Sequence, residues 1–581
     1  MLRSWAVRVR PSAVLAVGVP VVVFAVLAWQ HRWVSDDGYI NLRIVWNMLE
    51  GHGPVFNPGE RVEAGTSPLW LVVLAVVRPL LWWLDPGWVA VLAGIALTLV
   101  GLALAAVGAR RWWASLGRDA PLPLGAAVIV ALPPMWDFAS SGLETGLSFG
   151  WLGACWWATA RRLGSRDQRF EEQGYDEYEE PLTIDRPSWL PVLIGLGPLV
   201  RPDLVLFSVA FAVALGVTST WTRRQLARAL ALGLALPVAY QVFRMGYFGL
   251  LVPNTALSKE AGRNLWSRGW NYLDVYLSST LLLIPLALLL IVIVAEAAPS
   301  GATRRHVVVA AAPVLAGLLN AVYVVKVGGD FMYARLFLPA TFAVLCPVAA
   351  LPLVKHRPPA WLAVGPLVAV VALVGLDRRW DPVVITDDPT TPAVDGDLSL
   401  DGIANERGVY ALLAGTEHPV TYEDYEGYIE PGLEGMDLPR DGALVDMGGT
   451  GRVARSDQPM LVAGSIGLVG YKFLGTHLID QLTLADSLGA HMEPGEVGRP
   501  GHEKFLSWDW ILARFAHPAA DDGPVVGQAR EALECGDLEE LVDAVAEPLT
   551  PGRFLRNLVG SFERTRMRVP ADPAEARAAF C

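Results

Sequence analysis

The sequence predicts a polytopic α-helical membrane protein, with about eleven transmembrane helices and a C-terminal extracytoplasmic domain of mixed α/β structure. Its 581 residues are 53% hydrophobic and its mean hydropathy is +0.39, which is too apolar for an ordinary soluble protein of this length. Apolar segments long enough to cross a bilayer recur up to about residue 376, and a polar segment follows. We therefore expect a transmembrane domain over 1–376 and a soluble domain over 377–581.

Charge divides the chain at the same point. Residues 1–376 carry 29 Lys and Arg against 22 Asp and Glu, a net charge of +7. Residues 377–581 carry 17 against 36, a net charge of −19, so the whole chain has the charge −12. A mildly basic membrane half and an acidic soluble half exclude a nucleic-acid-binding protein, which needs a basic surface.

Basic clusters orient the chain in the membrane. Arg3, Arg8 and Arg10 precede the first predicted span, 12–30, so the positive-inside rule places the N-terminus in the cytoplasm. The same rule places Arg110 and Arg111 inside, which requires an odd number of crossings before them. Of the two apolar stretches available, 87–109 is expected to span, and 67–84 to lie on the outer surface or dip in partway.

The remaining basic clusters are consistent with further crossings. The other predicted spans are 120–135, 142–160, 188–200, 203–221, 226–247, 273–295, 306–326, 335–353 and 360–376. This odd total places the tail outside. The acidic run 167–185 is expected to be a solvated cytoplasmic linker.

The tail after residue 376 has the pattern of a globular domain. A Pro- and Asp-rich connection, 381–392, leads to short apolar runs at 443–445, 460–462 and 478–479, which predict strands. Residues 529–547 have the apolar spacing of a helix. Cys535 and Cys581 could form a disulfide if the tail lies in an oxidising compartment, and the sequence leaves this open.

Polar residues collect in the loops that this topology places outside. Asp36 and Asp37 directly follow the first span, where charge is costly, so they are the leading candidates for a functional site. The other candidates on this side are Arg43, Glu63, Glu144, Arg201, Asp203, Lys259, Asp330, Arg335 and, from the tail, His502. Their convergence on one face predicts an active site that opens away from the cytoplasm.

Each candidate also has a structural interpretation. Asp36 or Asp37 could cap a helix, and Glu144 and Asp203 could pair with neighbouring arginines. Arg201 and Arg335 could be interfacial side chains that reach toward the headgroups. Lys259 could be a surface residue, and a single loop histidine such as His502 is more often structural.

These residue types suit glycosyl transfer from a polyprenyl phosphate. A carboxylate accepts the proton of the acceptor hydroxyl and stabilises positive charge at the anomeric carbon. Cations meet the negative charge that grows on the departing phosphate. Asp36 and Asp37 are the expected catalytic acids, and Arg43, Arg201, Lys259 and Arg335 the expected phosphate ligands. The expected substrate contacts are Glu63, Glu144, Asp203, Asp330 and His502.

Several motifs carry a resemblance to a known family. They are RWVSDDGYI at 32–40, GHGPVFNPGERVEAGTS at 51–67, SSGLE at 140–144, GLLVPNTA at 249–256, VGGDFM at 327–332, VGY at 469–471, HLIDQ at 477–481 and RPGH at 499–502. With these motifs the chain resembles the AftB family of actinobacterial cell-wall arabinofuranosyltransferases, within the GT-C superfamily, over most of its length.

The resemblance implies a GT-C fold with eleven spans in the plasma membrane and an extracytoplasmic C-terminal domain, for which binding of the carbohydrate acceptor is the expectation. The implied donor is decaprenyl-phosphoryl-arabinofuranose. The implied acceptors are the non-reducing arabinan ends of arabinogalactan and lipoarabinomannan, extended through β-(1→2) linkages. The first-loop acid of GT-C enzymes is their usual catalytic residue, which corresponds to Asp36 or Asp37, and we favour Asp36 with Asp37 in support. A β-linked donor that gives a β-linked product implies net retention, by a nucleophilic second acid or by front-face attack.

Three alternatives are weighed against this hypothesis. Another polyprenyl-phosphate-sugar transferase, such as a mannosyltransferase, would need the same acid and cations. A transporter or flippase of lipid-linked sugar would place ionisable residues at mid-membrane in paired repeats, and neither is visible here. A wall-assembly scaffold would not need the acids. No cofactor is established by the sequence, although a divalent cation could bind Asp36, Asp37 and His502 if the tail folds back over the first loop.

Overall fold

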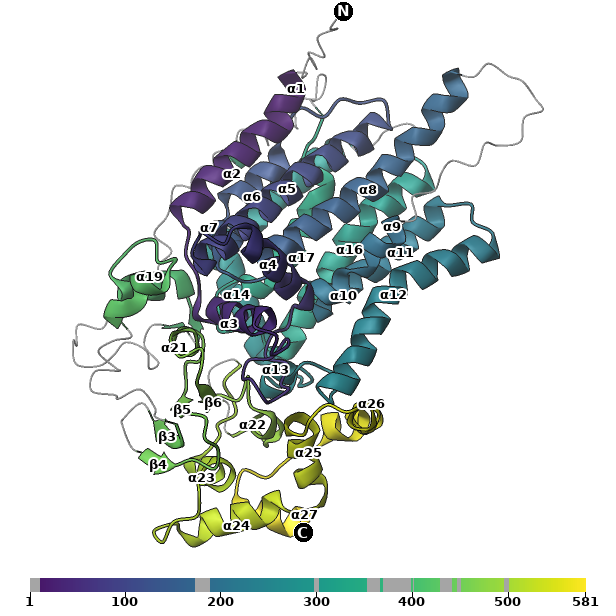
Figure 1. The fold of residues 1–581 in the computed structure, drawn as a ribbon. Helices are drawn as coiled ribbons and strands as arrows, with labels where there is room; N and C mark the ends of the chain where they lie inside the picture. Colours follow the sequence, from purple (N-terminus) through teal and green to yellow (C-terminus); the bar gives the residue numbers. More distant parts are fainter. Residues whose placement is uncertain are drawn as a thin grey trace, which may run out of the picture.

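The computed structural model describes residues 11–172, 189–296, 302–352, 366–368, 399–400, 402–428, 441–446, 451–495 and 501–581. It is a mostly helical molecule in which long apolar helices form a bundle and the tail packs at one end of it (Figure 1). The predicted connection 381–392, the boundary at 376 and most of the span 360–376 lie outside these ranges, as does most of the acidic run 167–185.

Within the described ranges, four helices are long and apolar enough to cross a membrane. They are Pro11–Gln30, made of α1 (Pro11–Ala13), η1 (Val14–Gly18) and α2 (Val19–Gln30), then α5 (Pro86–Ala114), α12 (Arg223–Tyr247) and α16 (Arg304–Val327). A fifth candidate is the pair α14 (Trp266–Thr280) and α15 (Leu283–Glu296), which is bent by 75°. The chain is therefore a membrane protein, and the count of eleven spans stays a prediction.

The ambiguous pair of apolar stretches folds as the charge argument predicted. The stretch 87–109 lies within α5, which has 29 residues, whereas 67–84 yields only α4 (Pro68–Leu80), with 13 residues. A bilayer crossing needs about 20 helical residues, so α4 is too short to span. Asp85 caps α5 by accepting a hydrogen bond of 2.7 Å from Gly87, which explains where the long helix begins.

Other predicted spans are broken. The stretch 120–135 forms α6 (Leu124–Ala131), which stops where Pro133 starts α7 (Pro133–Ser140), because the residue before a proline avoids helical geometry. The stretch 188–200 forms α9 (Trp189–Gly195) and α10 (Gly197–Val200). The expected span 273–295 corresponds to two helices, which start at Trp266 and bend at Leu281, where φ is +49°.

Glycines bring α5 and α8 (Thr145–Glu172) into close contact at the centre of the bundle. A Cβ atom at Gly146 would lie 2.2 Å from the carbonyl oxygen of Gly94, and one at Gly153 would lie 2.3 Å from that of Gly101. Small residues at such a crossing let two backbones approach, which drives helix association where the solvent is lipid. The crossing holds the N-terminal end of α8, beside Glu144, against the bundle.

Short helices fill the end of the bundle that faces the tail. They are α3 (Asp36–Leu49), η2 (Pro202–Leu204), α13 (Asn254–Ser258) and η3 (Arg335–Phe337). Two further helices, α11 (Val205–Thr218) and α17 (Leu338–Leu345), lead away from this end, and η4 (Cys346–Val348) follows α17 and packs beside α6. Most of the polar candidates lie in these helices or in the loops beside them.

The tail contains the predicted sheet. Strands β3 (Ala443–Asp446), β4 (Gly451–Val453), β5 (Met460–Ala463) and β6 (His477–Asp480) lie in the order β4-β3-β5-β6. Strand β5 runs parallel to both β3 and β6, with Leu444 opposite Met460 and Met460 opposite His477, while β4 is antiparallel to β3. A two-stranded antiparallel pair, β1 (Ser399–Leu400) and β2 (Ile403–Ala404), precedes this sheet. All three strand predictions are confirmed.

Helices complete the tail. They are α19 (Glu406–Ala414), η5 (Tyr422–Tyr425), α21 (Leu468–Lys472), α22 (Ser487–His491), α23 (Trp508–Phe515), α24 (Pro524–Leu533), α25 (Gly536–Ala546), α26 (Pro551–Arg566) and α27 (Pro573–Phe580). The single helix predicted over 529–547 is two helices, because Gly536 has φ +49° and starts α25 in a new direction. A disulfide joins Cys535 to Cys581.

The hydrophobic core of the bundle continues into the tail. Buried residues of one cluster run from Ala16 through the bundle to Ile403, Leu468 and Leu484, while a second cluster around Trp510 belongs to the tail alone. The first part of the tail is thus packed as an extension of the bundle, and the last part has its own core.

Candidate active site

Helix α3 presents the two first-loop acids. Ser35 caps the helix, since its hydroxyl accepts a hydrogen bond of 3.0 Å from the amide of Gly38, so neither acid is needed as the cap. Gly38 lies against Ser141, where a Cβ atom would be 2.7 Å from the carbonyl oxygen. This close contact fixes the first turn of α3, and Asp36 and Asp37 leave it in different directions.

Asp36 points toward the tail. Its carboxylate accepts hydrogen bonds from the amides of Leu468 at 2.8 Å and Gly467 at 3.1 Å. Burial raises the pKa of Asp36 to about 6, against the opposing effect of these hydrogen bonds. Gly467 cannot carry a side chain, because its Cβ atom would lie 1.9 Å from the carbonyl oxygen of Asp36. Asp36 therefore joins the first loop to the tail.

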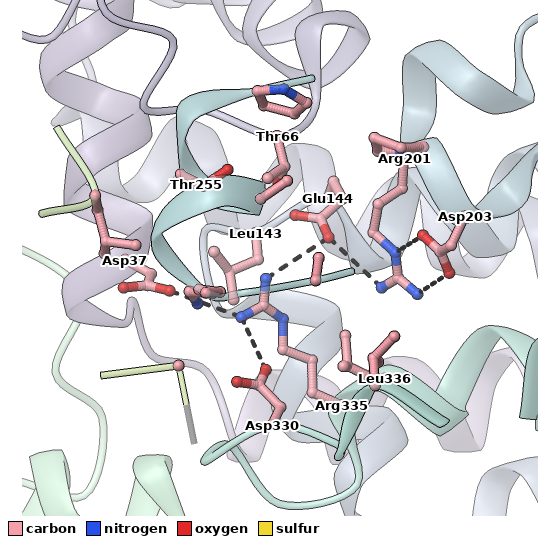
Figure 2. A pocket seen from close by; sticks show the side chains of 18 of the residues that line it. Asp37, Thr66, Leu143, Glu144, Arg201, Asp203, Thr255, Asp330, Arg335 and Leu336 are labelled. Atoms are coloured by element: carbon pink, nitrogen blue, oxygen red, sulfur yellow. Dashed lines mark hydrogen bonds and ion pairs between the residues drawn. The ribbon is translucent and has the colours of Figure 1, made fainter. Parts of the chain in front are cut away.

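Asp37 points into a cavity of about 220 Å³ (Figure 2). The cavity lies between the first turn of α3, the loops 64–66, 143–144 and 201–203, and the segments 253–261 and 323–336, and the tail closes it with Leu484 and Gly501. Asp36 is not among the lining residues. The expected arrangement has Asp36 at the reacting centre and Asp37 in support. In the structure, Asp37 lines the cavity and Asp36 contacts the tail instead.

Arg335 lies at the centre of the charged lining. Its guanidinium is 3.7 Å from Asp37, 3.7 Å from Glu144 and 3.5 Å from Asp330, as Figure 2 shows. Arg335 and Asp330 come from one loop that begins with Gly328 and Gly329, whose φ angles of +92° and +76° turn the chain sharply after α16. The three carboxylates and one guanidinium come from three separate chain segments.

A second arginine, Arg201, lies on the other side of Glu144 and is paired with Asp203. Arg201 donates two hydrogen bonds to Asp203, of 2.6 and 2.7 Å, and is 3.7 Å from Glu144. Asn320 donates a further hydrogen bond of 2.8 Å to Asp203. The bidentate pair holds Arg201 rigidly and leaves Glu144 shared between two guanidiniums.

Lys259 supplies a further cation to the cavity lining. It follows α13 directly and lines the cavity, with its ammonium 5.4 Å from the ring centroid of Phe331. In the described part of the chain it forms no ion pair. Its neighbour Glu260 instead pairs at 2.6 Å with the buried Lys504 of the tail, which fixes this turn.

Arg268 is a lining residue that the sequence analysis missed. It lies in the first turns of α14, pairs with Glu503 of the tail at 2.6 Å and donates to the carbonyl oxygen of Gly328 at 3.2 Å. The sequence signal is weak, since a charge just before an apolar stretch resembles an ordinary helix end. Arg268 connects α14, the Asp330 loop and the tail.

Some polar atoms of the lining residues have no hydrogen-bond partner within the described ranges. They are Oε1 of Glu144, Nη1 of Arg201 and Nε of Arg335. Buried polar groups are normally hydrogen-bonded, so unpaired ones in a cavity wall suit a polar ligand. Sugar hydroxyls and phosphate oxygens are ligands of that kind.

Arg43, an expected phosphate ligand, does not line the cavity. It is fully buried and donates to the carbonyl oxygens of Phe56, Phe473 and Thr476 at 2.9, 2.9 and 2.6 Å, and also to that of Gly470. Burial lowers the pKa of Arg43 to about 10. All of these acceptors are backbone groups, so Arg43 instead holds the segment 470–476 of the tail against α3.

Two predicted substrate contacts also lie outside the cavity lining. Glu63 is held by Arg244 of α12 at 2.6 Å and by the hydroxyl of Tyr240 at 2.6 Å, so it anchors the first loop to a membrane helix. His502 packs its ring against Phe331, with 4.9 Å between the ring centroids, and its neighbour Gly501 contributes to the lining instead.

The tail does fold back over the first loop, as the proposed cation site required. Among the residues that the structure describes, however, no three His, Cys, Asp or Glu side chains are arranged to hold a metal ion, and Asp36, Asp37 and His502 do not form such a group. The site consists instead of four acidic and four basic side chains among the described lining residues: Asp37, Glu144, Asp203, Asp330, Arg201, Lys259, Arg268 and Arg335.

Comparisons with known proteins match the whole chain. Residues 452–578 match the AftB family C-terminal domain. A terminal β-(1→2)-arabinofuranosyltransferase of Mycobacterium tuberculosis is 34% identical, over 97% of this chain and 96% of its own length. One of Corynebacterium glutamicum is 31% identical, over 92% of this chain and 83% of its own. Among solved structures, ArnT from Cupriavidus metallidurans bound to undecaprenyl phosphate is 17% identical with a TM-score of 0.46, covering 80% of this chain and 89% of that one.

Proposed function

The chain belongs to the terminal β-(1→2)-arabinofuranosyltransferase family, and we propose from this that it takes arabinofuranose from decaprenyl-phosphoryl-arabinofuranose. The proposed acceptors are the non-reducing arabinan ends of arabinogalactan and lipoarabinomannan. The enzyme is thus a membrane glycosyltransferase, and we propose a GT-C architecture in the plasma membrane with the cavity and the tail outside the cytoplasm. The relatives do not favour a mannosyltransferase or a flippase.

One observation carries the proposal for the site. Asp37, Arg335 and Lys259 come from segments far apart in the sequence and line one cavity at the end of the bundle. Asp37 is the most exposed of the three carboxylates around Arg335, with 20% of its side chain accessible against 2% for Glu144 and 7% for Asp330. The acid that substrate can reach most easily is therefore Asp37, and we assign to it the role first expected of Asp36.

The proposed chemistry uses each group for one task. Asp37 accepts the proton of the attacking acceptor hydroxyl, or stabilises the positive charge at the anomeric carbon as the phosphate departs. Lys259 meets the phosphate, because its charge is not already neutralised by a carboxylate among the described residues. Arg335 shares its charge among three carboxylates at 3.5 to 3.7 Å, distances that leave room for a phosphate or sugar oxygen to compete.

Retention of configuration adds a requirement. A β-linked donor that gives a β-linked product needs either a transient bond between the sugar and a carboxylate or attack from the face that the phosphate leaves. Glu144 and Asp330 lie on either side of the guanidinium that Asp37 approaches, so the cavity supplies a second acid for the first of these routes. We propose that Glu144, whose Oε1 atom has no hydrogen-bond partner among the described residues, contacts the sugar.

The tail is proposed to select the acceptor. Leu484 and Gly501 close the cavity from that side, and Glu503 holds Arg268 in the lining. An arabinan chain that approaches from outside the membrane would pass along the tail before it reaches Asp37. The domain 377–581 is thus proposed to bind the carbohydrate, while the isoprenoid part of the donor stays in the lipid.

The Asp37→Asn variant tests the assignment. Purified protein in lipid nanodiscs is given decaprenyl-phosphoryl-arabinofuranose and an oligoarabinoside, and the disaccharide linkage of the product is determined. Loss of a catalytic carboxylate should lower the rate by about 100-fold or more. The matched control is Asp274→Asn, an exposed acid of α14 outside the cavity, which should keep the wild-type rate. Full activity of Asp37→Asn with an inactive but folded Asp36→Asn would return the catalytic role to Asp36.

A further inference from the structure

Helix α26, Pro551–Arg566, has the opposite polarity to an ordinary surface helix. It buries Arg553, Asn557, Ser561 and Arg564 against the protein. Its apolar side chains point outward, with Leu555 62% exposed, Val559 72% and Phe562 51%. Spacings of four and three residues place these three on one stripe. In water, a surface helix buries its apolar face and exposes its polar one.

The buried polar face fixes this orientation. Arg553 donates to Glu540 at 2.7 Å, Asn557 donates to the carbonyl oxygen of Ala544 at 2.8 Å, and Arg564 donates to that of Gly249 at 3.1 Å. If the helix rolled over to cover its apolar stripe, these hydrogen bonds would be lost and their buried polar groups would be left unpaired, which is strongly unfavourable. The buried hydrogen bonds of α26 therefore hold its apolar stripe in the outward orientation.

Helix α26 lies at the end of a membrane-length helix. Asn557 also donates to the carbonyl oxygen of Gly246 in the last turn of α12, at 3.2 Å, and a Cβ atom on Gly246 would lie 2.2 Å from the ring of Phe554. Figure 1 shows α26 beside the end of α12 that faces the tail. The outer face of α12 is apolar and open up to this end, where Val238 is 53% exposed and Val242 43%.

Exposed tryptophans lie at or near the ends of other helices. Trp29 ends α2 and is 46% exposed, Trp82 and Trp83 precede α5 and are 72% and 62% exposed, and Trp270 in α14 is 59% exposed. Tryptophans of this kind form belts at the headgroup level of a bilayer. Each of these helix ends faces the cavity or the tail, as does the end of α12 that carries α26.

We propose that α26 lies in the membrane interface, parallel to the membrane surface, with Leu555, Val559 and Phe562 in the outer acyl region of the leaflet next to the tail. The occupant of the apolar stripe is lipid, because the stripe continues the exposed apolar face of α12 and the buried polar face, with Arg553, Asn557 and Arg564, is bonded to protein. The charged residues Arg556 and Glu563 are exposed beside the stripe, where lipid headgroups can meet them. Such a helix holds its polar face at the headgroups and its apolar face about 5–10 Å into the lipid. The contact anchors the tail over the cavity independently of substrate.

The test places an environment-sensitive fluorophore on the stripe of the full-length protein. Val559→Cys and Phe562→Cys are labelled with NBD, while Cys155 and Cys346 are buried and Cys535 is paired with Cys581. The matched control is Val525→Cys, an apolar residue of α24 that is 38% exposed in the same domain. Labelled proteins are used only if their thermal unfolding matches that of the wild type.

The proposal predicts blue-shifted emission at positions 559 and 562 in nanodiscs that hold one copy of the protein. Lipids with a doxyl group near the headgroup should quench these labels at least about twofold more than the label at position 525. Aqueous iodide should quench the label at position 525 more than the labels at 559 and 562. Quenching of all three labels by iodide alone would overturn it. A blue shift that appears only in discs with two copies of the protein, without quenching by doxyl lipid, would mean that the stripe contacts a second copy. That result would also overturn the proposal.

Discussion

The carboxylate of Asp36 accepts a 3.1 Å hydrogen bond from the backbone amide of Gly467, which lies 431 positions further along the chain. No side chain fits between them, because a Cβ atom on Gly467 would lie 1.9 Å from the carbonyl oxygen of Asp36. Asp37 is the next residue and lines the cavity. Any shift of the tail at Gly467 is therefore passed directly to the proposed catalytic carboxylate.

Asp36 should make the stability of the protein depend on pH. Burial raises the folded-state pKa of Asp36 from 3.8 to about 6, so the folded protein binds this proton more tightly than the unfolded chain does. The stability that protonation contributes is complete below about pH 4 and is lost as the pH rises through about 6. A shift of about two pKa units corresponds to about 3 kcal/mol.

The measurement compares the wild type with Asp36→Asn by thermal unfolding in detergent between about pH 4.5 and about pH 7, which spans the folded-state pKa of about 6. The amide cannot titrate, so the difference between the two proteins isolates Asp36 from other buried groups. The wild type should be favoured most at the acid end. A difference that does not change with pH would contradict the burial of this carboxylate.

Arg43 should be irreplaceable by lysine for structural reasons. Its guanidinium donates hydrogen bonds to four backbone carbonyl oxygens, one at Phe56 and three in the segment 470–476. The ammonium group of a lysine is a single point of charge and cannot reach all four. We expect Arg43→Lys to lower the free energy of unfolding by about 3 kcal/mol or more and to expose the tail to protease.

The matched control for Arg43 is Arg452→Lys, since Arg452 forms an exposed pair with Asp521 at 2.6 Å. Exposed pairs contribute little, so this variant should unfold like the wild type. A stable Arg43→Lys enzyme with a raised donor KM would instead restore the phosphate-binding role that the sequence suggested.

Lys259 should control donor affinity. Lys259→Gln removes the cavity cation that has no carboxylate partner in the described ranges, and we expect the donor KM to rise about tenfold or more with a smaller change in kcat. Lys326→Gln, on α16 outside the lining, is the control. Equal donor KM values for the two variants would remove Lys259 from the proposed phosphate site.

Arg335 should contribute to stability as well as to catalysis. Arg335→Met leaves Asp37, Glu144 and Asp330 close together without their shared cation, and breaking such a buried ion group costs about 3–5 kcal/mol. Thermal unfolding in nanodiscs measures this loss. Arg407→Met removes a looser 3.8 Å pair with Asp137 and two hydrogen bonds to backbone carbonyls, and it should cost less because it leaves no cluster of buried carboxylates without a cation. Equal losses would mean that the cavity charges are screened by water.

Cysteine labelling should establish the orientation of the tail. In a variant with Asp537→Cys, an exposed position of α25, a membrane-impermeant maleimide should label intact cells. Arg224→Cys, at the exposed start of α12, should label only after permeabilisation, because the basic cluster there is expected inside. The reverse pattern would place the cavity on the cytoplasmic side.

Local properties of the chain were readable from its sequence. Asp36 and Asp37 could be identified because charge beside a membrane helix is costly regardless of the rest of the fold. Helix α5 could be identified because its apolar length and the charged residues at its ends are enough to predict a membrane span. The break at Pro133 was also visible in the sequence, since proline ends a helix, but the apolar run around it dominated the prediction.

The roles of the site residues depended on distant partners. Asp36 and Asp37 are adjacent in sequence and chemically identical, and their different positions depend on distant partners such as the amides of Gly467 and Leu468, which bind Asp36. The sequence around Arg43 suggested a phosphate ligand, because nothing local shows that its guanidinium donates to backbone carbonyls of the tail. Arg268 was missed because its importance comes from Glu503 and Gly328, which no local pattern connects to it.

The long separation between Asp36 and Gly467 also has a consequence for biosynthesis. At about 5–20 residues per second, a ribosome needs roughly 20–90 seconds to make the chain that separates them. During that interval the bundle can insert while the first-loop carboxylate stays hydrated and its amide partners do not yet exist. The catalytic pocket is therefore finished last, and a nascent chain released before its final third would enter the bilayer with an incomplete enzyme.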